Sequence, residues 1–287
     1  MRLPNLTIYG KFYLPQIYLC LWLISSSIQY SYSQHSSFKN PANEILGNKG
    51  TLEKGPWAFF TNPAGLSDID YIIIGIGNQN DFLIQELNAR TIFASIPYKS
   101  STLTAGYTYT GFRLFNIQEY NFALAKQLAP WLNMGIRFNY SNRQQNGKMK
   151  AQIFTINAGW QLIPLEQIQL GFYMRNPTQN KWRTDYESKN SQTLIATSLA
   201  YHPSKNIVLE AGISKYIDYD PSVSLMLTSK IYKTISIKGN VSSSPLRIGL
   251  GSSLTWQNSQ FDIGLSHHET LGLSSAIGLI YNLSKKK

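Results

Sequence analysis

A strand-like alternation of apolar and polar residues, preceded by a proline and carrying a central glycine, occurs four times in this chain. The four copies begin at Pro97, Pro130, Pro164 and Pro203, and their glycines are Gly106, Gly135, Gly171 and Gly212. Successive side chains of a strand point to opposite faces, so each copy predicts a strand with one apolar and one polar face. In the second copy, Ile136 belongs to the apolar face and Asn133 to the polar one. Over most of a chain, this pattern predicts either a soluble β-sandwich or an outer-membrane β-barrel.

The composition favours the barrel. Only 14% of the 287 residues are charged and 43% are hydrophobic, whereas soluble domains carry about 25% charged residues. A wall that meets lipid on one face and water on the other needs few charges. The net charge is +11, but the basic residues are scattered singly apart from Lys285, Lys286 and Lys287. We therefore predict no nucleic-acid partner, and expect the charge to meet outer-membrane lipid and lipopolysaccharide.

The first 33 residues read as a signal peptide. Arg2 and Lys11 precede an apolar stretch, and the small residues Ser31 and Ser33 fit a cleavage site before Gln34. A signal anchor is the alternative, but Pro15 and Gln16 shorten the apolar core below the ~20 residues that a spanning helix needs.

The single cysteine, Cys20, lies within this predicted signal peptide. Leu19 stands where a lipoprotein site needs a small residue, so Cys20 is expected to leave with the signal. The mature chain then has no disulfide, no catalytic thiol and no cysteine-based metal site. No other segment reaches the 18 apolar residues of a membrane-spanning helix.

After the signal we predict about fourteen strands, an even number as bacterial single-chain barrels require. They cover residues 70–77, 90–97, 101–110, 117–127, 131–141, 150–162, 166–175, 191–202, 205–216, 221–230, 233–242, 245–256, 259–267 and 270–283. Connections after even-numbered strands are short, and most of those after odd-numbered strands are longer. Short periplasmic turns that alternate with longer outer loops are typical of membrane barrels.

Two further patterns fit a barrel. Aromatic residues near predicted strand ends suggest girdles at the membrane interfaces: Tyr98, Trp131, Tyr140, Trp160, Tyr201, Tyr216, Trp256 and Tyr281. In the last strand, Gly278, Tyr281 and Leu283 resemble the insertion signal that the outer-membrane assembly machinery reads. That machinery is therefore an expected partner.

The run Trp57-Ala58-Phe59-Phe60-Thr61-Asn62-Pro63-Ala64-Gly65-Leu66 resembles the N-terminal segment of FadL-like barrels. It is most similar to their PorV/PorQ branch in the Bacteroidetes, which belongs to the type IX secretion system. The resemblance implies a linker and lumenal hatch at residues 34–67, followed by a fourteen-stranded barrel over residues 68–287. It also implies that Asn62, Pro63, Ala64, Gly65 and Leu66 form the turn between hatch and wall. Glu53-Lys54-Gly55-Pro56 departs from the acidic, alanine-rich stretch usual in that family.

No arrangement of residues predicts an enzyme, a cofactor or a metal site. Of His267 and His268, only one can face the lumen because they are adjacent in a strand, and no nucleophile elbow is present. Asp218 and Asp220 supply too few oxygen ligands for Ca²⁺. The four histidines lack zinc-site spacing.

Two functions remain. The favoured one is type IX secretion or surface attachment, with secreted cargo or partner subunits bound at the outer rim. The alternative is a FadL-like channel for small hydrophobic compounds. The channel needs an apolar groove among the outer loops, which the following residues could line: Phe82, Leu83, Ile84, Phe112, Leu114 and Phe115.

Overall fold

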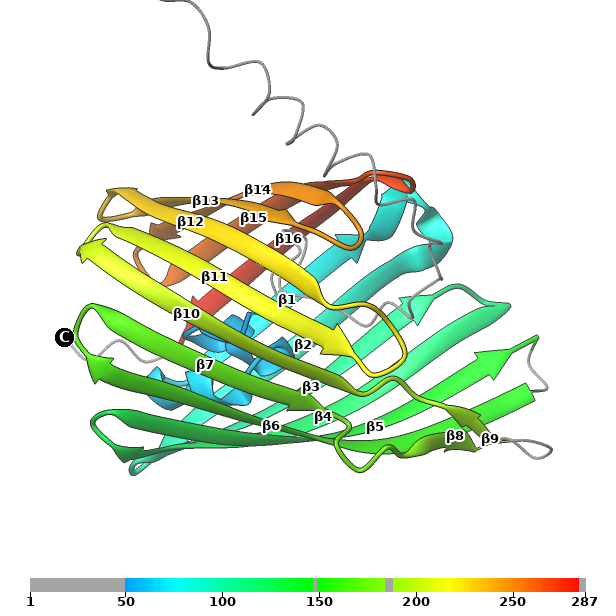
Figure 1. Ribbon diagram of the computed structural model, residues 1–287. Helices are drawn as coiled ribbons and strands as arrows, with labels where there is room; N and C mark the ends of the chain where they lie inside the picture. Colours follow the sequence, from blue (N-terminus) through cyan, green and yellow to red (C-terminus); the bar gives the residue numbers. More distant parts are fainter. Residues whose placement is uncertain (1–49, 147–148, 184–187, 284–287) are drawn as a thin grey trace, which may run out of the picture. The chain divides into compact units, whose positions relative to one another are not determined.

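A closed ring of antiparallel strands forms the wall of the protein. The computed structural model describes residues 50–146, 149–183 and 188–283, all within one unit that spans Gln34–Lys287. The predicted signal peptide lies outside the described residues. The described sheet has sixteen strands, and pairing of β5 with β6 closes it. All of them except β8 and β9 make up a fourteen-stranded barrel (Figure 1), which confirms the predicted fold class.

The strands of the ring are β1 (Ile73–Asn80), β2 (Asn88–Tyr98), β3 (Ser101–Gly111), β4 (Phe115–Ala129), β5 (Leu132–Gln145), β6 (Met149–Leu165), β7 (Ile168–Arg175), β10 (Leu194–Ser204), β11 (Ile207–Tyr216), β12 (Ser222–Tyr232), β13 (Ile235–Ser242), β14 (Arg247–Trp256), β15 (Ser259–His268) and β16 (Gly272–Asn282). Short 3-10 helices precede or connect them: η1 (Pro56–Phe60), η2 (Pro63–Asp68), η3 (Asp81–Leu83) and η4 (Gln85–Leu87). None of the described helices is long and apolar enough to cross a membrane.

Connections at the two ends of the barrel differ as the sequence predicted. The turns after β2, β4, β6, β10, β12 and β14 all contain two residues. The connection from β1 to β2 is longer and contains η3 and η4. We assign the end with the two-residue turns to the periplasm, as in other bacterial barrels.

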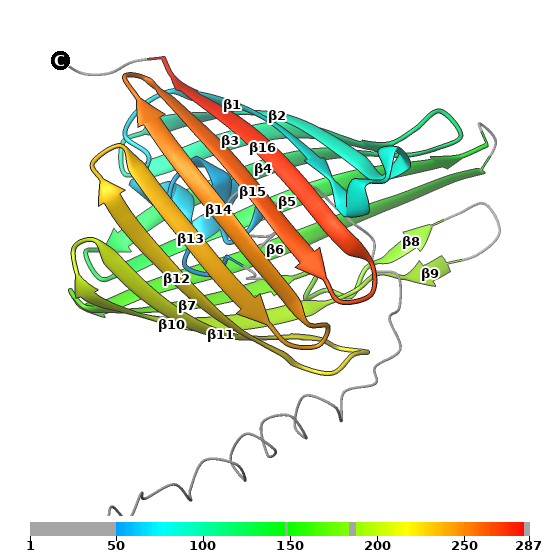
Figure 2. The same ribbon diagram turned by 90° about the horizontal axis from the view of Figure 1, so that it is seen from above.

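One outer connection holds two strands that the sequence did not predict. β8 (Lys181–Arg183) and β9 (Ser188–Asn190) pair with each other, and β8 pairs with β6 through Arg183 and Gln152. They lie beside the outer end of β6 (Figure 2). Strands of three residues are too short to leave an alternation in the sequence.

The outer face of the ring is apolar. Leu225 and Leu227 on β12 are 55% and 48% exposed, and Ile263 on β15 is 52% exposed. Asn133 and Arg137 on β5 point inward and are buried, so the predicted faces of this strand are confirmed. Apolar side chains exposed around a whole barrel belong in a bilayer.

An aromatic row marks the outer membrane boundary on one side. Tyr107, Tyr120 and Tyr140 face outward on neighbouring strands, with ring centroids 5.1 and 6.3 Å apart. The next outward row continues with Gln118, Asn142 and Gln152. Since polar residues replace apolar ones beyond the tyrosines, the outer ends of β4, β5 and β6 extend past the bilayer.

Six of the eight aromatic residues of the predicted girdle are exposed: Tyr98, Trp131, Tyr140, Tyr201, Trp256 and Tyr281. Trp160 shares the outward face of β6 but is only partly exposed. Tyr216, however, shares the inward face of β11 with the buried Ser214, and its ring lies 6.1 Å from that of Tyr219. Its predicted place in the girdle was wrong because the register of β11 puts it on the lumenal face.

Candidate functional site: a hatch packed into the lumen

The segment before the first strand fills the lumen and forms the main apolar core of the molecule. Its helices η1 and η2 lie inside the ring, nearer the periplasmic end (Figure 1). Phe59 and Leu66 are fully buried, and they belong to one apolar cluster with Phe93 on β2 and Ile280 on β16. We call the described lumenal part, residues 50–69, the hatch.

Asn62 joins the two helices of the hatch and fastens them to the wall. Its side-chain oxygen accepts a hydrogen bond from the Ala64 amide at 3.1 Å and so caps η2. Its amide nitrogen lies 2.6 Å from the Thr51 carbonyl oxygen. The same nitrogen is 3.3 Å from the Trp160 carbonyl oxygen on β6 and 3.2 Å from that of Phe172 on β7. One buried side chain therefore fixes both the fold of the hatch and its position.

The predicted turn at Asn62–Leu66 is part of the hatch itself. Pro63–Asp68 forms η2, and Pro63, Ala64, Gly65 and Leu66 are buried. A glycine is required at position 65 by close approach and not by a positive φ. A Cβ there would lie 1.9 Å from the Glu53 carbonyl oxygen. Close approach of two hatch backbones excludes any larger residue.

The repeated strand glycines make room for the hatch. A Cβ on Gly106 would lie 2.5 Å from the Phe59 ring, and one on Gly135 would lie 2.4 Å from the Pro63 carbonyl carbon. On Gly171 it would lie 2.7 Å from the Thr51 carbonyl oxygen. A Cβ on Gly159 would lie 1.7 Å from the side-chain oxygen of Asn62. Gly212 differs, because its nearest neighbours are the hydroxyls of other wall residues.

Polar side chains of the wall also hold the hatch. Arg137 on β5 donates a hydrogen bond to the Phe59 carbonyl, and its guanidinium lies 3.5 Å from the Tyr173 hydroxyl. On β15, Asp262 accepts a hydrogen bond from the Trp57 indole at 2.8 Å. On β10, the Ser198 hydroxyl lies 2.5 Å from that of Thr51. Buried polar groups that are paired in this way stabilise one position of the hatch.

The hatch is fastened unevenly around the ring. Helix η2 packs mainly against β4, β5 and β6. On the opposite side, Lys238 of β13 reaches Glu53 with 3.7 Å between the charged atoms. The inward residues of β12, such as Ser224 and Thr228, are only partly buried. The lumen is therefore more open beside β12 than beside β5.

The six apolar residues that could line an outer groove lie in three different environments. Leu83, Ile84, Phe112 and Leu114 are exposed on two outer connections, with Leu83 at 57% and Leu114 at 50%. Phe82 instead packs edge-on against His268, with ring centroids 5.9 Å apart. Phe115 packs against a separate cluster, Ile117, Ala151, Ile153 and Trp182. The sequence did not reveal Trp182, which β8 brings over this cluster beneath the Arg143 guanidinium, at 5.0 Å.

The remaining predicted residues are placed as follows. His268 is buried on the inward face, where its Nδ1 accepts hydrogen bonds from the Thr270 and Leu271 amides, while His267 faces outward. Within the described residues, no group of three metal-ligating side chains occurs.

The predicted insertion signal lies in β16. Gly278 pairs with Gly77 on β1, where the first and last strands of the ring meet. Tyr281 and Leu283 of the predicted insertion signal are exposed at the periplasmic end.

No family model and no curated protein matches the sequence. The fold is similar to several solved structures. The CymD monoaromatic hydrocarbon channel has a TM-score of 0.68 and 10% identity, over 86% of this chain and 98% of that one. A FadL homologue from Pseudomonas aeruginosa has a TM-score of 0.63 and 10% identity, over 87% and 99%. The P. putida toluene transporter TodX has a TM-score of 0.61 and 9% identity, over 81% and 95%. The chain therefore has the fold of FadL-like fourteen-stranded barrels.

Proposed function

We propose that this protein is a passive channel for small hydrophobic compounds. The observation that carries the proposal is a hatch that fills the lumen of a FadL-like barrel but is fastened unevenly to its wall. A plug that never moves would not need fewer contacts on one side of the ring than on the other. The compared proteins CymD and TodX are described as a monoaromatic hydrocarbon channel and a toluene transporter, which supports this substrate class.

The outer end offers apolar contacts for a hydrophobic solute. Leu83 and Ile84 lie on one outer connection, and Phe112 and Leu114 on another. Such side chains are exposed outside the bilayer at a cost, since burial of each would yield roughly 1.5–3 kcal/mol. A solute that covers them recovers part of this free energy, so they can collect hydrophobic compounds at the mouth.

The route past the hatch runs, in this proposal, beside β12 and β13. The Lys238–Glu53 ion pair spans that side, and both side chains are mostly buried, at 16% and 9% exposed. Breaking the pair would remove one tie between the start of the hatch and β13 while Arg137 and Asn62 still hold the other side. A partial movement of this kind opens a passage without expelling the hatch.

The secretion function that the hatch motif favoured gains no support from the comparisons. The three compared proteins are described as a hydrocarbon channel, a FadL homologue and a toluene transporter. Type IX secretion, its partner subunits and a Bacteroidetes origin therefore rest on the resemblance of the hatch segment alone.

Uptake into liposomes tests the channel. The assay uses vesicles with lipopolysaccharide in their outer leaflet, because toluene crosses a plain phospholipid bilayer without a channel. Vesicles that contain the barrel should take up toluene faster than empty ones, with no gain for a sugar of similar size. Glu53→Gln should raise toluene uptake further because it releases the hatch from β13. Lys54→Gln is the matched control, since the Lys54–Asp68 pair at 3.5 Å lies within the hatch and is exposed. Toluene uptake equal to that of empty vesicles for both wild type and Glu53→Gln would rule the channel out.

A further inference from the structure

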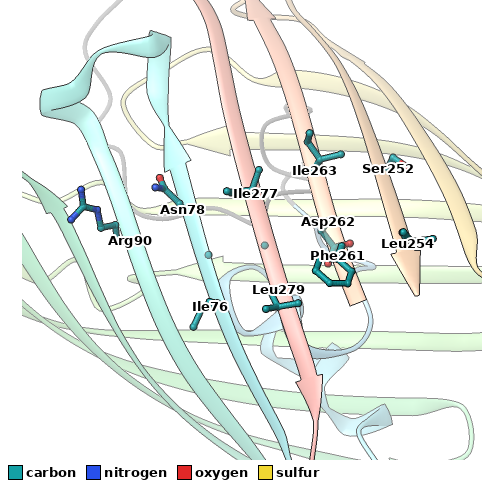
Figure 3. Close-up of a pocket in the computed structure, with 12 residues that line it drawn as sticks. Ile76, Asn78, Arg90, Ser252, Leu254, Phe261, Asp262, Ile263, Ile277 and Leu279 are labelled. Atoms are coloured by element: carbon teal, nitrogen blue, oxygen red, sulfur yellow. The ribbon is translucent and has the colours of Figure 1, made fainter. Parts of the chain in front are cut away.

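A depression of about 680 Å³ lies on the outer wall of the barrel, across β14, β15, β16, β1 and β2. Figure 3 shows its side chains on the outer surface of these strands, with Asp262 pointing the other way. Most of its lining is apolar: Ile76, Leu254, Phe261, Ile263, Ile277 and Leu279. In an outer-membrane barrel this surface meets lipid and not water.

One end of the depression lies at the level of the lipid headgroups. Arg90 pairs with Tyr109, which pairs with Gln118. Arg90 is the third residue from the outer end of β2 (Asn88–Tyr98) and faces outward. Its side chain therefore lies toward the headgroups of the outer leaflet.

The other end of the depression lies deeper in the bilayer. The row of Arg90 continues through Asn78, Ile277 and Ile263 to Ser252. Arg90 is near the outer end of β2, but Ser252 lies in the middle of β14. Because barrel strands tilt, one hydrogen-bonded row descends through the membrane as it passes around the wall. The depression thus runs from headgroup level down to the hydrocarbon, as an acyl chain does.

Arg90 supplies a charge at the upper end. Within the described residues, no carboxylate forms an ion pair with its guanidinium. Asn78 on β1 is the cross-strand partner of Arg90 and faces outward like it. In Figure 3 the Arg90 side chain extends away from β1, so a bound phosphate would lie above β2 with Asn78 at its edge. A guanidinium beside an amide can bind a phosphate through several charge-assisted hydrogen bonds.

We propose that this depression is a specific site for a phosphorylated glycolipid of the outer leaflet. Arg90 and Asn78 hold a phosphate of its headgroup, and an acyl chain lies along the apolar row toward Leu254 and Phe261. The outer leaflet of a Gram-negative membrane supplies such a lipid. The site rests on the outer-membrane location of the barrel and is independent of its channel activity.

Native mass spectrometry of the barrel, purified in mild detergent from outer membranes, tests the site. The wild-type barrel should retain one phosphorylated glycolipid. Arg90→Gln should lower the retained fraction by about tenfold because charge-assisted bonds to phosphate are lost. Ser252→Trp keeps the charge but fills the apolar row, and should also lower retention. Lys215→Gln, which removes an exposed basic residue on the outer face of β11, should leave retention unchanged.

Several results would overturn the site. These are a wild-type barrel without glycolipid, equal losses in Arg90→Gln and Lys215→Gln, and retention of a phosphate-free lipid in place of the phosphorylated one. Loss of a dimer in Arg90→Gln would assign this face to a contact between copies. Heat-modified mobility on gels checks that each variant folds. If Arg90→Gln does not fold, Ser252→Trp decides by itself.

Discussion

At the scale of single residues, the hatch packs closely against the wall because several lumenal positions of the wall are glycines. Gly106, Gly135 and Gly171 stand where an alternating strand would otherwise carry a lumenal side chain. A glycine normally weakens a strand. Its repeated use in the middle of strands follows from the approach of the hatch backbone, and the same contact explains Gly159.

Gly135→Val should therefore loosen the hatch. The added Cβ would lie 2.4 Å from the Pro63 carbonyl carbon, and overpacking of this kind costs about 1–3 kcal/mol. We expect a lower temperature for heat modification on gels and faster proteolysis of the hatch. Gly239→Val is the matched control, because a Cβ there would meet its nearest atom at 3.8 Å and valine favours strands. Equal effects of the two substitutions would contradict a role of Gly135 in seating the hatch.

At the scale of elements, alternation was enough to predict the wall. Every strand of the ring overlaps a predicted one, because a strand with one face in lipid and one in the lumen must alternate. β5 continues past its predicted outer end to Gln145, where polar residues replace the apolar ones of the alternation, whereas most of the extra residues of β6 lie at its periplasmic end. β8 and β9 were missed because three residues are too few for a pattern.

The hatch could be predicted only in part. The run from Trp57 to Leu66 predicted a hatch before the first strand, and most of these residues are buried in the structure. Its helical form and its partners were not predictable, since Asn62 and Arg137 act through contacts between distant parts of the sequence. The depression at Arg90 was missed for the same reason, because five strands have to be in register before it exists.

A charged substitution should destabilise the barrel on the lipid-facing side of a strand and should be tolerated on the lumenal side. Leu227 faces outward in the middle of β12, so Leu227→Arg should cost about 2–4 kcal/mol in the bilayer. Thr228→Arg places the same charge on the adjacent, partly open lumenal face and should fold nearly as well as wild type. Urea titration of folding into lipid vesicles measures both. Asn133, although lumenal, is a poor site for this test because it is buried beneath Asp68. Comparable losses for the two β12 variants would mean that the outer face of the sheet does not meet lipid.

At the scale of the whole molecule, the barrel is closed by hydrogen bonds all around and its lumen is closed by a separate segment. The wall does not depend on the hatch for its strand pairing, so the hatch can move while the barrel stays intact. In the proposed movement the ties to β5, β6 and β7 stay, and the ion pair with β13 breaks. A solute that passes the hatch therefore requires the hatch to shift within an intact wall.

Locking the hatch to the wall tests this central claim most directly. The hydroxyls of Thr51 on the hatch and Ser198 on β10 are 2.5 Å apart, close to the S–S distance of about 2.05 Å in a disulfide. The double variant Thr51→Cys with Ser198→Cys can thus be locked by oxidation and released by reduction. We predict that toluene uptake is lost in the oxidised barrel and returns on reduction, whereas either single variant is insensitive to oxidation. Equal uptake by the oxidised and reduced double variant, with the disulfide confirmed by mass spectrometry, would contradict passage past a moving hatch.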